Sequence, residues 1–284
     1  MGVTMFDFLS DKLGYHTKLY VILPGCVNQG KKPAGTLYLL HGGGGNSQDW
    51  IRFSSIERYA EEKNFAVVMP EVDGGCFYSD MKYGYPYYQF VTEEVPMVAE
   101  KMFPVNTEPE NRYVAGFSMG GYGAYKWAFT KPGFFRAAAN LSGLSFVTEL
   151  FAEQRARYQD KEQEKNDVVS LCWGSLEELA GTDSDSKVWI DRASETGEYP
   201  ALFGAIGTED GGYAHAQKYL AYCKEKNVKI YYEEMPGGLG YDDREISGLD
   251  TDTVVQRAAQ FCQVKDQEKS EHQEGFTTGN GDRR

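Results

Sequence analysis

Short apolar runs alternate with helix-patterned segments along most of the 284 residues, and this alternation restricts the fold more than any other feature of the sequence. Most of the apolar runs end in glycine-rich loops, which is typical of buried strands. Strands separated by helices predict a mostly parallel sheet with helices on both faces, an α/β architecture. The predicted strands lie within residues 17–25, 35–45, 65–75, 111–117, 135–143, 199–212 and 228–238, and the predicted helices within residues 56–64, 87–103, 119–131 and 213–226.

Residues 144–199 interrupt this alternation. They include a highly charged segment, residues 151–167, which we expect to be a solvated helix. We predict that the whole stretch is an insertion that forms a cap beside the cleft. The predicted domain spans residues 1–264, and the polar residues 265–284 are predicted to be a disordered tail.

Composition limits the class of partner. The net charge of −13 argues against nucleic acid and against an anionic membrane surface, because both require concentrated basic residues. No apolar run reaches the roughly 18 residues of a membrane span, and the first residues lack the basic and apolar regions of a signal peptide. The five cysteines are odd in number and form no C-x-x-C pair. We therefore expect a cytoplasmic, reduced protein without metal or cofactor that acts on a small molecule; a homo-oligomer is compatible with the sequence.

The segment GFSMG, residues 116–120, lies between a predicted strand and a predicted helix. In this context G-x-S-x-G predicts a nucleophilic serine on a strained turn, because the glycines let strand and helix pass close to it. The helix N-terminus behind Ser118 favours developing negative charge. The alternative is that Ser118 only caps the helix.

A second glycine-rich loop, LLHGGGGN, follows the predicted strand that ends near residue 40. Its exposed N–H groups suit an oxyanion hole, completed by the N–H of Met119 after the nucleophile. A phosphate loop is the rival interpretation, but the Lys-Ser/Thr pair of a P-loop is absent. His41 is interpreted as a turn histidine that shapes the loop, with a catalytic base as the alternative.

The acidic residue of a triad is expected in the segment AIGTEDGG, residues 205–212, which ends another strand. The order Ser, then Asp, then His along the chain favours Asp210, with Glu209 second. Its role would be to orient an imidazole. Alternatively, Asp210 is a turn carboxylate that caps the following helix.

These stretches together resemble the esterase D-like α/β-hydrolases, which include tributyrin esterases, S-formylglutathione hydrolases, feruloyl and acetyl-xylan esterases and the antigen 85 mycolyltransferases. The resemblance rests on LLHGGGGNSQDW, YVAGFSMGGYGAYKWAF and GTED and covers roughly residues 5–262. It implies an α/β-hydrolase fold, hydrolysis of acyl esters, Ser118 as nucleophile and Asp210 as the acid. It also implies an oxyanion hole from the N–H groups of Gly43 and Met119.

One position departs from the family. The resemblance places the catalytic histidine after the last strand, in a loop that here reads PGGLGY, so that Leu239 stands at the histidine position and Tyr241 at that of a following aromatic. Without an imidazole we expect weak or absent hydrolysis of short-chain or hydroxycinnamoyl esters. The substitutes in the sequence are His215, His272 and His16, and Asp242 and Asp243 would be poor bases. The alternatives are an inactive relative that binds an ester, a sugar or a protein, and an acyltransferase.

Aromatic residues are frequent in residues 74–90, after a strand end on the expected active-site side. We predict that this segment and Trp50 line a substrate pocket, with Tyr78 and Asp80 as polar contacts and Tyr241 nearby. The alternative is that these residues only pack against one another at the rim of the cleft.

Overall fold

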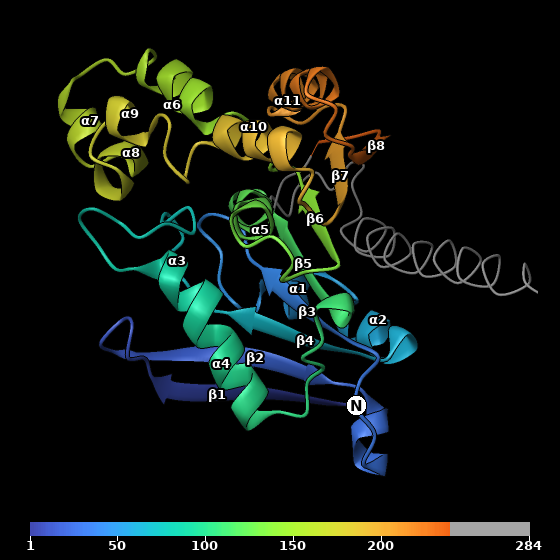
Figure 1. Cartoon of the computed structure of the whole chain (residues 1–284). Coiled ribbons are helices and arrows are strands. Elements are labelled where there is room, and N and C mark those ends of the chain that lie inside the picture. The colour runs from blue at the N-terminus through green and yellow to red at the C-terminus, as the bar shows by residue number, and fades with distance from the viewer. Residues whose placement is uncertain (239–284) are drawn as a thin grey trace, which may run out of the picture.

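The computed structural model describes residues 1–238, which fold around one eight-stranded sheet with the strand order β1-β2-β4-β3-β5-β6-β7-β8 (Figure 1). β1 and β2 are antiparallel to their neighbours, and the other six strands are parallel. This is the predicted α/β-hydrolase sheet. The strands are β1 (Gly2–Leu9), β2 (His16–Leu23), β3 (Gly35–Leu40), β4 (Phe65–Pro70), β5 (Arg112–Phe117), β6 (Ala137–Leu141), β7 (Ala201–Gly207) and β8 (Tyr231–Met235).

Strand β1 is an addition to the predicted set. It pairs along its whole length with β2, from Gly2 opposite Leu23 to Leu9 opposite His16. As an edge strand it buries little: only Phe6 and Phe8 are partly covered, and every other residue of β1 is exposed. Because so few of its residues reach the core, the sequence lacks the continuous apolar run that identifies the central strands.

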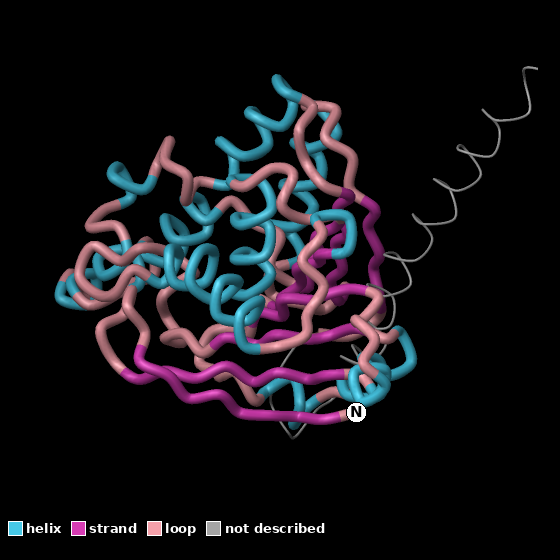
Figure 2. Tube along the Cα trace, turned by 60° about the horizontal axis from the view of Figure 1, so that its bottom comes forward, coloured by secondary structure: helices cyan, strands magenta, loops and turns pink. Residues whose placement is uncertain are grey.

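Helices cover both faces of the sheet, as predicted. Helices α1 (Asp49–Phe53) and α2 (Ile56–Lys63) pack on one face, where they share a hydrophobic cluster with β3 and β4. The opposite face carries α4 (Val95–Met102), α5 (Met119–Thr130) and α11 (Tyr213–Glu225), within a larger cluster. Figure 2 shows most helices on that second side of the strands. Short 3-10 turns lie at Gly25–Gln29 and Pro109–Asn111.

The helix predicted over residues 87–103 is present but consists of three pieces. A turn at Tyr87–Gln89 (α3) leads into a π-helix at Phe90–Glu94, and α4 follows with Pro96 in its first turn. Proline is tolerated there because the first N–H groups of a helix have no intrahelical acceptor.

Five helices lie between β6 and β7 and form the stretch predicted to be a cap. Figure 1 shows α6 to α9 grouped together, with α10 beside α5. The charged segment is not one helix: α6 ends at Arg155 and a new helix begins at Glu162. In residues 1–238 no helix is long and apolar enough to cross a membrane. The five are α6 (Val147–Arg155), α7 (Glu162–Lys165), α8 (Val168–Cys172), α9 (Leu176–Leu179) and α10 (Ser186–Thr196).

Candidate active site

Ser118 occupies the single-residue turn between β5 and α5. Its backbone has φ 53° and ψ −116°, a left-handed φ that a serine adopts only under local strain. The turn is held from two sides, because the Ser118 N–H donates to the Leu141 carbonyl at 2.7 Å and its carbonyl accepts from the Tyr122 N–H at 3.0 Å. Ser118 is partly exposed, whereas the next eleven residues are buried. This is the strand-turn-helix context predicted for a nucleophile.

The glycines around Ser118 are required by close backbone packing. A Cβ on Gly116 would overlap the carbonyl oxygen of Gly120, and a Cβ on Gly120 would overlap that of Leu40. A third glycine, Gly143, would place a Cβ against the Ser118 carbonyl. Strand and helix therefore do crowd past the serine, which is the reason given for the spacing of the motif.

The turn after β6 supports the serine and was not singled out in the sequence. Asn140 accepts a hydrogen bond from the Gly143 N–H at 2.8 Å, and Ser142 has a φ of 53°. The Ser142 N–H donates to Ala205 on β7 at 2.8 Å. The signal is the Asn-Leu-Ser-Gly sequence at a strand end, whose residue types are typical of turns.

The glycine loop after β3 lies against the first residue of α5. A Cβ built on Gly43 would lie 3.8 Å from the Met119 Cβ. The Gly44 N–H donates to the Gly74 carbonyl at 3.0 Å, which ties this loop to the loop after β4. Because Met119 begins α5, its N–H has no intrahelical acceptor. Gly43 and Met119, the two residues predicted to donate to the oxyanion, therefore lie next to each other in space.

His41 is a structural histidine in this loop. It is fully buried, its Nδ1 lies 2.9 Å from the Gly42 carbonyl oxygen, and its Nε2 accepts from the Val72 N–H at 3.3 Å. A carbonyl accepts and an N–H donates, so the imidazole is neutral with its proton on Nδ1. Both ring nitrogens are therefore engaged in shaping the loop.

Asp210 lies in the loop after β7, at the same edge of the sheet as the end of β5. One carboxylate oxygen accepts from the Gly212 N–H at 2.6 Å, directly before α11. Asp210 is partly buried, whereas Glu209 is exposed. The carboxylate thus holds the turn, and as a triad acid it remains a prediction.

The loop that begins after β8 runs along the Asp210 loop. The Glu209 N–H donates to the Gly237 carbonyl at 3.0 Å. A Cβ on Gly238 would lie 3.3 Å from the Glu209 carbonyl oxygen and 3.9 Å from the Asp210 nitrogen. Leu239 and Tyr241 lie outside the described residues.

The Esterase family model matches residues 10–240. The chain belongs to this family of esterases. The sequence resemblance is therefore confirmed at the level of the family.

Two relatives and one solved structure illustrate the similarity of this esterase-family chain. It is 30% identical to an S-formylglutathione hydrolase of Bos taurus over 82% of the chain and 85% of that protein. It is 26% identical to an acetyl esterase of Caldicellulosiruptor saccharolyticus over 85% of the chain and 93% of that protein. The fluorophosphonate-binding serine hydrolase F of Staphylococcus aureus superposes with a TM-score of 0.78 at 30% identity, covering 92% and 98% of the two chains.

The histidines proposed as substitute bases have other partners in this esterase-family chain. His215 Nε2 lies 3.4 Å from Glu153 on α6, and His16 Nδ1 lies 2.8 Å from Asp7 on β1. His272 lies outside the described residues. Within residues 1–238, His, Cys, Asp and Glu side chains form no group of three that could hold a metal ion.

Two of the side chains predicted to line a substrate pocket, Trp50 and Tyr78, lie inside the protein. Trp50 is 2% exposed and donates its indole N–H to Leu40, and Tyr78 is 1% exposed. Asp80 is exposed, but both of its oxygens accept from Gln89 at 3.0 Å. Trp50 and Tyr78 pack in the hydrophobic clusters on the two faces of the sheet, and each donates to a carbonyl at the end of β3, that of Leu40 or that of His41. This burial corrects the expectation that they face the cleft.

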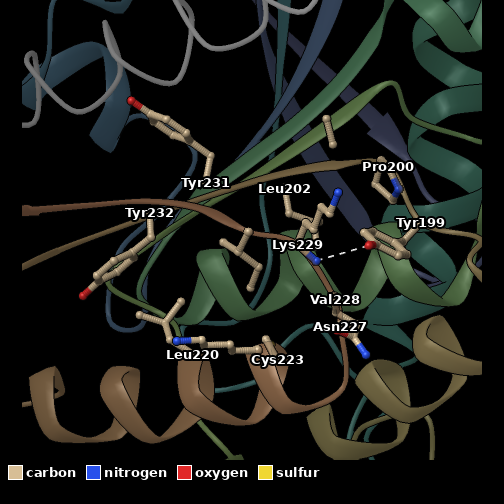
Figure 3. A pocket seen from close by; sticks show the side chains of 13 residues that line it. Tyr199, Pro200, Leu202, Leu220, Cys223, Asn227, Val228, Lys229, Tyr231 and Tyr232 are labelled. Atoms are coloured by element: carbon tan, nitrogen blue, oxygen red, sulfur yellow. Dashed lines mark hydrogen bonds between the residues drawn. The ribbon is translucent and has the colours of Figure 1, made fainter.

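A separate pocket of about 950 Å³ lies between α11 and the first residues of β7 and β8 (Figure 3). The backbone N–H of Lys229 donates there to the Tyr199 hydroxyl at 3.1 Å. The parallel strands β7 and β8 start at this edge, and the Asp210 loop follows the opposite end of β7. This pocket is therefore distinct from the candidate active site.

Proposed function

We propose that the protein is a serine carboxylesterase for short-chain acyl or hydroxycinnamoyl esters, with Ser118 as its nucleophile and an impaired proton transfer. The observation that carries the proposal is the strained backbone of Ser118 at the start of α5. Such strain persists only where surrounding contacts enforce it, and it is concentrated at functional sites.

The proposed reaction begins with attack of the Ser118 hydroxyl on the acyl carbon of the ester. The carbonyl oxygen becomes an oxyanion, which the N–H groups of Gly43 and Met119 stabilise. The serine proton passes to a base, or to water where the base is missing, and then to the leaving oxygen, so that collapse of the intermediate breaks the ester C–O bond and releases the alcohol. The acyl-enzyme that remains is hydrolysed by water. Asp210 would orient and stabilise a base between itself and Ser118.

The expected base is the missing part of this arrangement. The family resemblance places it at Leu239, and Gly238, the residue before it, lies beside the Asp210 loop. Without an imidazole the serine keeps its proton and the leaving alcohol receives none. Loss of the histidine from a comparable triad lowers turnover by about 10⁶-fold, or about 8 kcal/mol of barrier. A residual rate of roughly 10³ to 10⁴ over water can come from the oxyanion hole and binding.

The substrate class is supported by the relatives. Their names, acetyl esterase and S-formylglutathione hydrolase, both denote enzymes for esters or thioesters of small acyl groups. The structural relative from Staphylococcus aureus is named for binding fluorophosphonates, reagents that react with nucleophilic serines. We therefore assign short acyl esters first and hydroxycinnamoyl esters second.

The experiment that tests the proposal compares p-nitrophenyl acetate hydrolysis by three proteins: the unchanged chain, Leu239→His, and Leu239→His combined with Ser118→Ala. We expect histidine to raise turnover by several orders of magnitude and Ser118→Ala to remove the gain. No gain from histidine would count against an esterase lacking only its base.

The second candidate is a relative that binds an ester, a sugar or a protein without turnover. It is favoured by one observation, an ordered serine turn combined with leucine at the histidine position. Calorimetry with non-hydrolysable ester analogues separates the two candidates: tight binding with no product, even by Leu239→His, would favour the binding protein. An acyltransferase ranks last because transfer to an alcohol also requires a base.

A further inference from the structure

The strongest unexplained feature outside the proposed triad is the dipeptide Phe77–Tyr78 in the loop after β4. Both residues have a left-handed backbone, with φ 45° and φ 44°. Residues with bulky side chains rarely adopt this region, because the Cβ atom crowds the backbone there. Two in succession require strong local contacts to hold them.

Those contacts surround Tyr78 on several sides. Its N–H lies 3.3 Å from the sulfur of Cys76, and its carbonyl accepts from Lys126 Nζ at 3.1 Å. Its ring lies over Gly123 so closely that a Cβ there would come within 2.5 Å of the ring carbon Cδ2. Helix α5 therefore fixes both the backbone and the ring of Tyr78.

Lys126 adds a link to the insertion between β6 and β7. This lysine is 3% exposed, and its ammonium also donates to the hydroxyls of Ser79 and Ser184, both at 2.9 Å. Tyr122, one turn earlier on α5, donates to the Ser184 carbonyl at 2.6 Å. The loop after β4, α5 and the loop before α10 are thus joined at one buried point.

The contacts of Tyr78 extend to the glycine loop after β3. The Tyr78 hydroxyl donates to the carbonyl of His41 at 3.0 Å. A Cβ on Gly120 would lie 2.6 Å from that same carbonyl oxygen, so the carbonyl is held between Tyr78 and the first turn of α5. Gly43, two residues further, lies against Met119. The position of the His41 carbonyl therefore sets how Gly43 faces Met119.

We propose that Tyr78 is a positioning residue for the oxyanion hole, acting through its hydroxyl on the His41 carbonyl while Lys126 holds its backbone. This inference rests on the proposed function, because it assigns a role to Gly43 and Met119 in that reaction. Tyr78 itself contacts no substrate in this role. Its bond orders the glycine loop before an ester arrives, which lowers the reorganisation needed when the oxyanion forms.

The test uses Tyr78→Phe, which removes only the hydroxyl. The matched control is Tyr125→Phe, because Tyr125 is equally buried on α5 and donates to a backbone carbonyl, that of Phe203, at 2.8 Å. Amide hydrogen exchange is followed by mass spectrometry in peptides that cover residues 39–46. We expect exchange there to become about tenfold faster in Tyr78→Phe and to stay unchanged in the control. Unchanged exchange, or equal acceleration in both variants, would overturn the inference.

A second readout measures the chemistry. The rate at which a fluorophosphonate labels Ser118 is compared in the same variants, both with Leu239 in place and in the Leu239→His background. We expect at least tenfold slower labelling in Tyr78→Phe and less than a twofold change in Tyr125→Phe; equal labelling overturns the positioning role. If no protein is labelled, the proposed nucleophile fails, and the exchange measurement alone decides the role of Tyr78.

Discussion

Gly120 lies where the first turn of α5 meets the end of β3. Its missing side chain allows the carbonyls of Leu40 and His41 to approach the helix, and those carbonyls precede the proposed oxyanion loop. The obstacle to a larger residue is the backbone of Leu40 and His41, which cannot rotate away as a flexible side chain can. Packing at this one residue therefore couples the serine turn to the glycine loop.

Gly120→Ala is expected to destabilise the protein by about 1–3 kcal/mol, because the added methyl overlaps these carbonyls. Alanine is favoured over glycine within helices by about 1 kcal/mol, so the loss would occur against helix propensity. Urea denaturation measures the change. The control is Gly2→Ala, at a site with no neighbouring atom within 4 Å; an equal change in both variants would contradict the packing argument.

At the scale of elements, Lys126 connects α5 to two loops through neutral oxygens. Burial lowers the pKa of Lys126 to about 8, opposed by the negative charges of Asp80 and Asp183 and by the nearby Cys76 and Cys172. The network survives loss of the proton, since the neutral amine can donate to two oxygens and accept from a serine hydroxyl. The folded protein therefore favours the neutral lysine more than the unfolded chain does.

This difference predicts a pH dependence of stability. Between pH 8 and the ordinary lysine pKa of 10.5, the unfolded chain holds a proton that the folded protein has released. The contribution of Lys126 to the free energy of unfolding therefore rises with pH in this window, by on the order of 3 kcal/mol in total, against the opposite contribution of buried thiols such as Cys76, whose pKa is raised in the folded protein. Lys126→Met should lack this rise. Urea denaturation of both proteins at pH 7, 8, 9 and 10 checks it, and parallel curves would count against the lysine as the source.

Another pair of elements, the β1–β2 hairpin and the π-helix, is joined by the buried carboxylate of Glu94. Glu94 is 4% exposed and accepts from the Ser10 hydroxyl at 2.5 Å and from the N–H groups of Asp11 and Lys12 at 2.7 and 3.2 Å. A buried carboxylate is stable there because three donors replace its hydration. The turn between β1 and β2 is thus anchored to the helix layer.

Glu94→Gln is expected to cost about 2 kcal/mol, because an amide replaces one acceptor oxygen by a donor that faces other donors. Hydrogen exchange in β1 should accelerate along with the loss of stability. Glu93→Gln serves as the control, since Glu93 is exposed and pairs with Lys12 Nζ at the surface. A similar loss in both variants would show that only charge matters.

At the scale of the whole molecule, the sequence was most informative where a residue has one dominant environment. The central strands are buried on both faces, so their apolar runs were recognisable, and the G-x-S-x-G turn has a steric requirement that only glycines meet. β1 was missed because an edge strand buries only parts of Phe6 and Phe8. An aromatic residue after a strand end has the same sequence pattern whether it faces a ligand or the core. The sequence therefore could not show that Trp50 and Tyr78 are buried in the core.

The charged segment of the insertion shows a different limit. Its composition predicts one solvated helix, but helix α6 ends at Arg155. The Arg155 side chain pairs with Asp167, at the start of α8, at 2.7 Å. That ion pair joins the end of α6 to the start of α8, and sequence periodicity carries no information about such contacts. The arrangement of these short helices therefore could not be predicted from local sequence patterns.

The bond from the Ser118 N–H to the Leu141 carbonyl also has a consequence for biosynthesis. The serine leaves the ribosome before β6, and the strained turn lacks this support until β6 has paired with β5. Domains form during synthesis only as their segments emerge. A nascent chain that ends before residue 141 should thus carry an unstrained and unreactive serine, so labelling of Ser118 would report that the centre of the sheet has been completed.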